Sequence, residues 1–206
     1  MTSSAAESAS LQQVRRRVFL ALFIALAIAV HTLEALLPNP LPWFRVGVAN
    51  ILSLCALFLF GLRALWLVSL CRIVAGSLLV GTLFGPGFML SLGGGLAANG
   101  LISLAYSLWK KTLTPVGLSV LGAFGHVTGQ LLIAWLLVVR HGSIWGLLPL
   151  FLLFALISGI LNGIVCRFLV DALAGHAAFA ATAEPYAAKR IRGTISTEYS
   201  QRMEES

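Results

Sequence analysis

A histidine and a glutamate stand three residues apart near the start of this chain, at His31 and Glu34. Both side chains can bind a polar group or relay a proton, and this spacing places them on one face of a helix. A link with three prolines follows, and it leads to Trp43, Arg45 and Asn50. Prolines remove backbone donors and disfavour helix at the residue before each of them. We interpret the stretch as one wall of a binding site near a membrane surface. A helix end that is simply capped near water is the alternative for His31 and Glu34.

An arginine, Arg72, stands near the centre of an apolar segment. Such a position costs roughly 2.5–3.5 kcal/mol on membrane-insertion scales, so a partner or a function is expected. Glu34 is the only carboxylate in the first five apolar segments, which makes it the natural partner. Counting from the helix ends puts Glu34 about 10 Å farther out, so a direct pair is a hypothesis. The alternative is that Arg72 extends to the inner membrane surface or binds helix carbonyls.

A further line of residues follows helical spacing in the fifth apolar segment, at Ser119, Gly122, His126 and Gln130. A polar residue in the middle of a membrane helix usually faces the interior of the bundle. We therefore expect this line to face a cavity, with a buried histidine bonded to a neighbouring helix as the alternative. Beside it, glycines 125 and 129 form a GxxxG pattern, which is typical of close helix packing. Glycines 93 to 95 are interpreted in the same way because no Walker pattern surrounds them.

The segments that hold these residues have the composition of membrane helices. Of 206 residues, 59% are hydrophobic and 10% are charged, and the mean hydropathy is +0.95. Soluble domains carry about a quarter charged residues. Six apolar segments are visible, at residues 18–37, 46–62, 64–80, 88–109, 115–139 and 144–173. The first is long enough, at about 30 Å, to cross the hydrocarbon core. The sequence predicts an all-α polytopic bundle of six transmembrane helices.

Basic residues predict the orientation of this bundle. One side holds Arg15, Arg16, Arg17, Arg63, Lys110, Lys111 and Arg167, whereas the other holds only Arg45 and Arg140. Positive residues favour the cytoplasmic side, so we expect both termini inside, in the inner (cytoplasmic) membrane of a bacterium. Residues 1–17 would then be a cytosolic tail, disordered over its first 13 residues. Residues 18–173 would be the membrane domain, and residues 174–206 a second cytosolic tail.

Several functions are disfavoured by what the chain contains. The net charge of +7 sits at segment ends, which indicates membrane orientation rather than nucleic-acid binding. The cysteines at 55, 71 and 166 have no CxxC or CxxH spacing, so we expect small buried side chains and neither a metal site nor a disulfide framework. No aspartate-rich prenyl transferase motif or nucleotide-binding motif is present. We therefore expect no catalytic residues and no cofactor.

A stripe of small residues runs along the first segment at Ala21, Ala25 and Ala29. Small residues every four positions let another helix approach closely. His31 lies about 200° around the helix from Ala29, so the stripe and the polar face point in nearly opposite directions. We expect the stripe to contact another membrane subunit.

The order of these motifs resembles the Gx transporter family, also described as heptaprenyl diphosphate synthase component I. The resemblance covers most of residues 18–173. It is carried by His31-x-x-Glu34, the proline-rich link, Arg45-Val-Gly-Val-Ala-Asn50, Arg72 with Gly76 and Gly81, Ser91-Leu-Gly-Gly, and Ser119-x-x-Gly122-x-x-x-His126-x-x-x-Gln130. The family pattern often has asparagine after this histidine, whereas Val127 stands here.

The resemblance implies a function. The family is similar to the S components of energy-coupling-factor (ECF) transporters, which have six helices, bind a small molecule near the outer face and dock on an energising module through an alanine stripe. It implies a membrane transporter or substrate-binding subunit, with a small-molecule substrate and an ECF-type module as partners. The expected binding residues are His31, Glu34, Arg45, Asn50, Arg72, His126 and Gln130. The alternative is a non-catalytic membrane component of heptaprenyl (polyprenyl) diphosphate synthesis, with a polyprenyl synthase subunit as partner.

Overall fold

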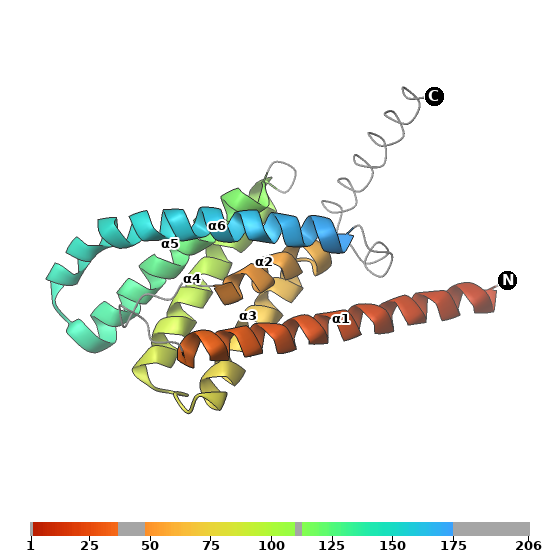
Figure 1. The fold of residues 1–206 in the computed structure, drawn as a ribbon, viewed down its shortest axis with the longest axis horizontal. Helices are drawn as coiled ribbons and strands as arrows, with labels where there is room; N and C mark the ends of the chain where they lie inside the picture. Colours follow the sequence, from red (N-terminus) through yellow and green to blue (C-terminus); the bar gives the residue numbers. More distant parts are fainter. Residues whose placement is uncertain (1, 37–47, 110–112, 175–206) are drawn as a thin grey trace, which may run out of the picture.

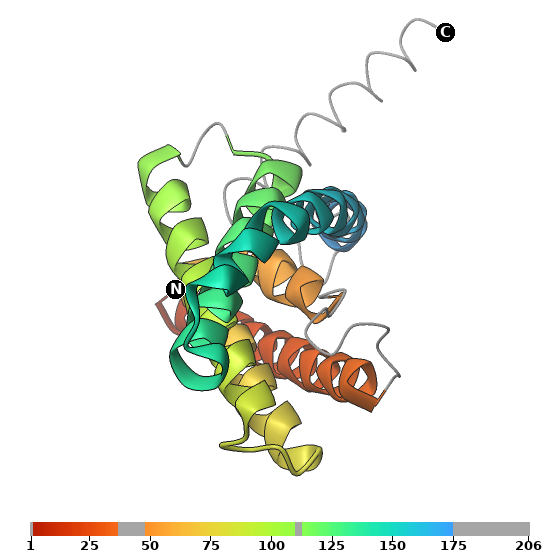
Figure 2. The ribbon, with the colours of Figure 1, turned by 90° about the vertical axis from the view of Figure 1, so that its left-hand side faces the viewer.

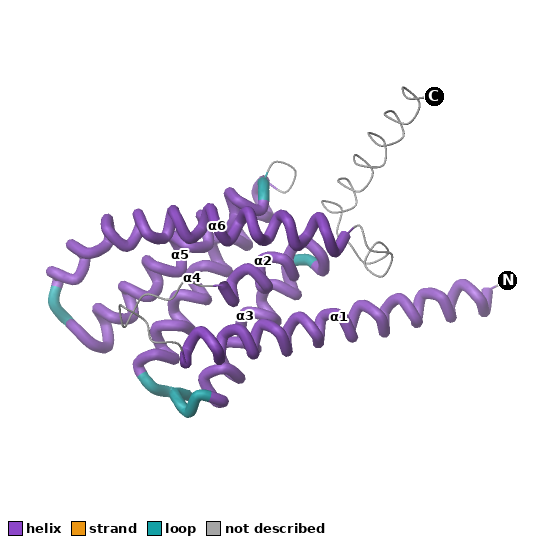
Figure 3. Tube along the Cα trace, viewed as in Figure 1, coloured by secondary structure: helices purple, strands orange, loops and turns teal. Residues whose placement is uncertain are grey.

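A computed structural model of the chain describes residues 2–36, 48–109 and 113–174. These residues form six α-helices and no strand (Figure 3). The helices are α1 (Thr2–Leu36), α2 (Val48–Phe60), α3 (Leu62–Leu79), α4 (Pro86–Trp109), α5 (Pro115–Ala134) and α6 (Leu148–Ala174). A short π-helix, η1 (Trp135–Val139), and a short 3-10 helix, η2 (Gly142–Leu147), join α5 to α6. The predicted all-α class is confirmed.

Helix α2 lies at the centre of the bundle (Figures 1 and 2). It packs against α1 and α3 on one side and against α6 and α5 on the other, while α4 packs on α3 and α5. Each residue from Ile51 to Phe60 is buried. A helix that is covered on all sides needs no polar face, and this explains why the segment is apolar almost throughout.

Five helical stretches are long and apolar enough to cross a membrane: Ser10–Leu36, Leu62–Leu79, Pro86–Trp109, Pro115–Val139 and Gly142–Ala174. Five such helices describe a multi-pass membrane protein. Helix α2 differs because its 13 residues cover only about 20 Å. The predicted count of six spans, with both termini inside, therefore stays a prediction.

The start of the chain differs from the predicted disordered tail, because α1 already begins at Thr2. No glycine or proline occurs in the first 36 residues, so a helix nucleated in the apolar segment can extend backward through them. Arg16 fixes this part of α1 to the core by donating a hydrogen bond of 2.6 Å to the carbonyl oxygen of Phe60. A guanidinium at the C-terminal end of α2 also complements the helix dipole.

The connection between α5 and α6 is irregular. The last turn of the fifth apolar segment is a π-helix, and Arg140 follows it in the left-handed conformation with a φ of 46°. The 3-10 helix η2, which includes Trp145, follows and leads into α6. π-helical turns occur frequently at functional sites.

Glycines set the spacing between α4, α5 and α6. A Cβ atom on Gly129 would lie 2.6 Å from the carbonyl oxygen of Gly93, and one on Gly125 would lie 3.0 Å from that of Ala97. The close approach of α4 and α5 agrees with the predicted packing role of these glycines. Gly159 and Gly163 of α6 pack equally tightly on α5. Sequence reasoning missed this second GxxxG pair, although the same pattern would have found it.

Candidate functional site

Helices α1, α2 and α3 bring together three of the predicted residues, His31, Asn50 and Arg72, which we call the α1–α3 polar cluster. Arg72 and His31 are each only 4% exposed. The Arg72 guanidinium donates a hydrogen bond to Oδ1 of Asn50. The His31 ring fits against α3 because position 76 is glycine, where a Cβ atom would lie 2.4 Å from Cδ2 of His31. The cluster is a buried polar contact between three helices.

For two further predicted residues the binding role stays a prediction. Glu34 is half-buried one turn beyond His31 on α1, and its pairing with Arg72 stays a prediction. Arg45, with the proline-rich link and Trp43, lies outside the described residues.

His126 and Gln130 lie on the face of α5 that contacts α4. A Cβ atom on Gly94 would meet Cε1 of His126 at 3.0 Å and Cγ of Gln130 at 2.8 Å. Along the same face, Ser119 and Gly122 line a small cavity and Gln130 lines a larger one. The polar line of α5 therefore faces the interior, and the binding roles assigned to it stay predictions.

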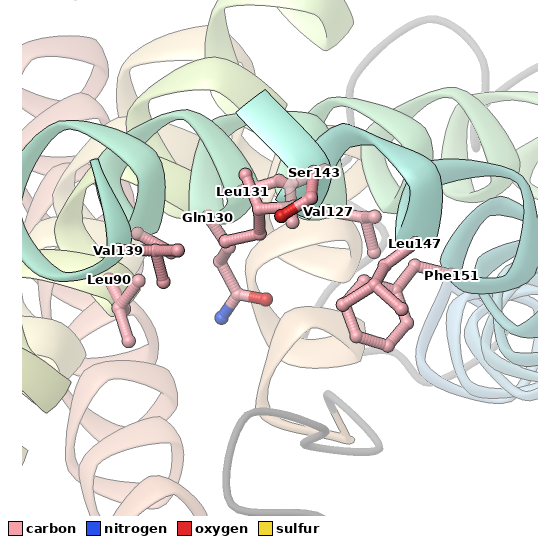
Figure 4. Close-up of a pocket in the computed structure, with 10 residues that line it drawn as sticks. Leu90, Val127, Gln130, Leu131, Val139, Ser143, Leu147 and Phe151 are labelled. Carbon is pink, nitrogen blue, oxygen red and sulfur yellow. The ribbon is translucent and has the colours of Figure 1, made fainter. Parts of the chain in front are cut away.

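The larger cavity has a volume of about 370 Å³, and we call it the Gln130 cavity. It is lined by Leu90, Val127, Gln130, Leu131, Ala134, Val139, Ser143, Ile144, Leu147 and Phe151. Figure 4 shows the Gln130 amide between Leu90 and Val139 on one side and Phe151 on the other. The walls come from α4, α5, η1, η2 and the start of α6. The surface is almost entirely apolar.

The irregular connection between α5 and α6 forms part of this wall, through Val139 and Ser143. His141 holds it in shape because its Nδ1 atom accepts a hydrogen bond of 3.3 Å from the backbone N–H of Ser143. The rings of Trp135 and Trp145 lie 6.3 Å apart across the same connection. Sequence reasoning missed the apolar lining, because leucines and valines around a cavity have the same pattern as those that face lipid.

A second, smaller cavity of about 30 Å³ lies among α2, α3, α4, α5 and α6, and we call it the central polar cavity. Its polar lining residues are Asn50, Ser53, Asn99, Ser119 and Asn162. The space is large enough for one or two water molecules. In the described part of the chain, Oγ of Ser53 and Nδ2 of Asn99 are buried without a hydrogen-bond partner. Asn50 joins this cavity to the α1–α3 polar cluster.

Asn162 is a lining residue that sequence reasoning missed. It was detectable, because it is an amide in an apolar helix and lies three residues from Gly159, on the face that packs against α5.

Two of the cysteines are far apart in the sequence but lie next to each other in the structure. Cys55 of α2 and Cys166 of α6 are fully buried, and their Sγ atoms lie 3.3 Å apart. Both are free thiols. Among the residues that the structure describes, no three His, Cys, Asp or Glu side chains are grouped closely enough to hold a metal ion.

Apolar helices around a buried core helix, with two internal cavities, define a multi-pass α-helical membrane protein. The model of the family described as heptaprenyl diphosphate synthase component I matches residues 23–169, and the chain belongs to this family. The matched region includes every lining residue of both cavities. Searches of the curated proteins and of the solved structures found no match.

Proposed function

We propose that this chain is a substrate-binding membrane subunit of a transport system and that it holds a small molecule in the Gln130 cavity. The observation that carries the proposal is the cavity itself, at about 370 Å³. Small-molecule sites have volumes of about 300–1,000 Å³ and combine an apolar lining with a few polar groups. Gln130 and Ser143 are the polar groups here.

The outer face of α1 is available for a partner subunit in this proposal. Ala21, Ala25 and Ala29 are exposed, whereas Phe23 and Ala27 are buried against the bundle. Small side chains on an exposed helix face permit close approach of another membrane helix. The partner would be an energising module of the ECF type, which agrees with the direction of the alanine stripe.

A second function, a non-catalytic membrane component of polyprenyl diphosphate synthesis, is favoured by two specific observations. The family name refers to such a component, and the lining of the Gln130 cavity is nearly all apolar. In this case a partner synthase subunit would carry the catalytic carboxylates and their magnesium, and this chain would hold an apolar molecule beside it in the membrane.

Native mass spectrometry of the protein, extracted gently from its own membrane, tests the proposal. Ala134→Trp fills the cavity, and Leu104→Trp is the control because Leu104 is 56% exposed on the outer surface of α4. We expect a bound small molecule on the wild type and on the control, and its loss from Ala134→Trp. A bound molecule retained by the filled variant, or none on any form, contradicts the proposal.

The same spectra separate the two functions. A compound found with co-purified energising subunits supports transport. A co-purified soluble prenyl synthase supports the second function and removes the first.

A further inference from the structure

We infer that the Gln130 cavity takes an uncharged molecule, with an apolar body and one hydrogen-bonding group that the Gln130 amide holds. The inference rests on the proposed function and names the class of ligand. It starts from the charge of the lining. Among the lining residues that the structure describes, none is a lysine, an arginine, an aspartate or a glutamate.

A charged group inside such a wall would lose its hydration and gain no opposite charge. Burial of an ionised phosphate or carboxylate is strongly unfavourable without a partner. The lining therefore selects against diphosphates and carboxylates in the cavity itself. The family name mentions a diphosphate, but the lining of the cavity does not favour a diphosphate as the group bound inside it.

The hydrogen-bonding group is assigned to Gln130 because its amide is available. It projects into the space between the apolar walls (Figure 4). In the part of the chain that the structure describes, no hydrogen bond joins this amide to another residue. The other polar lining residue, Ser143, already contacts Nδ1 of His141 through Oγ at 2.8 Å. A glutamine amide both donates and accepts, so it can hold a hydroxyl or a carbonyl oxygen.

We infer the apolar body of the ligand from the apolar side chains that lie on the two sides of the Gln130 amide. Leu90 and Val139 lie on one side, and Leu147 and Phe151 lie on the other. Aliphatic and aromatic side chains stabilise a ligand by removing its apolar surface from water. Both a branched hydrocarbon chain and a ring system suit this lining.

A competing arrangement would place a charged head outside the cavity. Arg140 is exposed and directly follows Val139 in the chain, so an anionic head could lie there with only its chain inside. This arrangement predicts that an anionic molecule binds more tightly than its neutral counterpart. A matched pair of probes, one anionic and one neutral, distinguishes the two arrangements.

The test compares binding of farnesol and farnesyl diphosphate to the full-length protein in detergent. Menadione, an uncharged ring compound, serves as the second neutral probe. We expect at least one neutral probe to bind at least tenfold more tightly than farnesyl diphosphate. Gln130→Leu should weaken it about tenfold, which corresponds to one lost hydrogen bond. Ala134→Trp should abolish its binding, whereas Arg140→Gln and Leu104→Trp should leave it unchanged.

Three results would overturn the inference: tighter binding of the diphosphate with loss in Arg140→Gln, neutral-probe binding that Ala134→Trp leaves intact, or no binding of either neutral probe. Unfolding temperatures of all variants show whether each has folded. The proposed function fails separately, since it requires a cavity-dependent molecule of any charge in the native spectra.

Discussion

Gly76 determines where His31 can lie, because the ring occupies the space that a side chain at position 76 would need. The contact would be 2.4 Å from a Cβ atom to Cδ2 of His31. One turn earlier on α3, Arg72 donates to Asn50. Charge alone indicated Glu34 as the partner of Arg72. The structure adds an uncharged amide on the intervening helix α2 as an acceptor for Arg72, and this contact depends on helix packing that a sequence does not contain. The pairing of Glu34 with Arg72 stays a prediction.

Substitution of Gly76 tests this packing. Gly76→Ala should destabilise the protein by about 1–3 kcal/mol, because the added methyl group must displace the buried His31 ring. The control is Gly100→Ala on α4, where a Cβ atom would meet nothing within 4 Å. Thermal unfolding in detergent should show a lower midpoint for Gly76→Ala only. Equal midpoints for the two variants would contradict the described contact.

Two asparagines of the central polar cavity should respond in opposite ways to the same substitution. Asn50→Leu removes the acceptor of the Arg72 guanidinium and should cost about 1.5–3 kcal/mol, the value of a hydrogen bond to a charged group. Asn99→Leu removes an amide nitrogen that is buried without a partner among the described residues, so it should be neutral or stabilising. The measurement is again the unfolding midpoint. A larger loss for Asn99→Leu would show that its amide is bonded.

Among the helices, α2 is the one on which α1, α3, α5 and α6 all pack. Its segment was predicted as a transmembrane helix, and the structure gives it 13 residues, of which Ile51 to Phe60 are all buried. Hydropathy could identify each helical segment, because apolar length is visible in a sequence. It could not separate the buried Leu57 from the exposed Leu104, since burial depends on the neighbours. For the same reason the apolar wall of the Gln130 cavity could not be predicted.

The thiols of Cys55 and Cys166 provide a direct test of how α2 packs on α6. Diamide should oxidise this pair to a disulfide, because the Sγ atoms lie 3.3 Å apart and need to approach by about 1 Å. The diamide accepts two electrons and two protons as the bond forms. Intact-mass spectrometry should show a loss of two hydrogens in the wild type and in Cys71→Ser, and none in Cys166→Ser. Oxidation seen only after unfolding would contradict the packing.

For the whole molecule, the path of the chain through the bundle tells more about where its two ends lie than the number of long helices does. The start of α1 and the end of α6 lie at the same end of the bundle, at the right of Figure 1. The described part of the chain thus begins and ends at one end of the bundle, and five of its helical stretches are long enough to span a membrane. A sixth crossing would need the short helix α2, and it stays a prediction.

The predicted orientation, with both termini on the cytoplasmic side, rests on the basic residues at the segment ends, and it can be tested with reporter fusions. Fluorescent-protein fusions at the N-terminus and at the C-terminus should both fluoresce, because this reporter folds in the cytoplasm. Alkaline phosphatase fusions at the same two places should be inactive. Phosphatase activity at one terminus only would show that the chain crosses the membrane an odd number of times.

We propose that the Gln130 cavity holds a small molecule in the cell, and photocrosslinking in the native membrane is the sharpest test of this proposal. A diazirine side chain replaces Leu131 in the cavity wall or, as the control, Leu104 on the exposed surface of α4. After illumination, position 131 should carry one defined non-phospholipid adduct, and position 104 should carry phospholipid. Phospholipid at both positions, or no adduct at position 131, would show that the cavity holds no such molecule in the membrane.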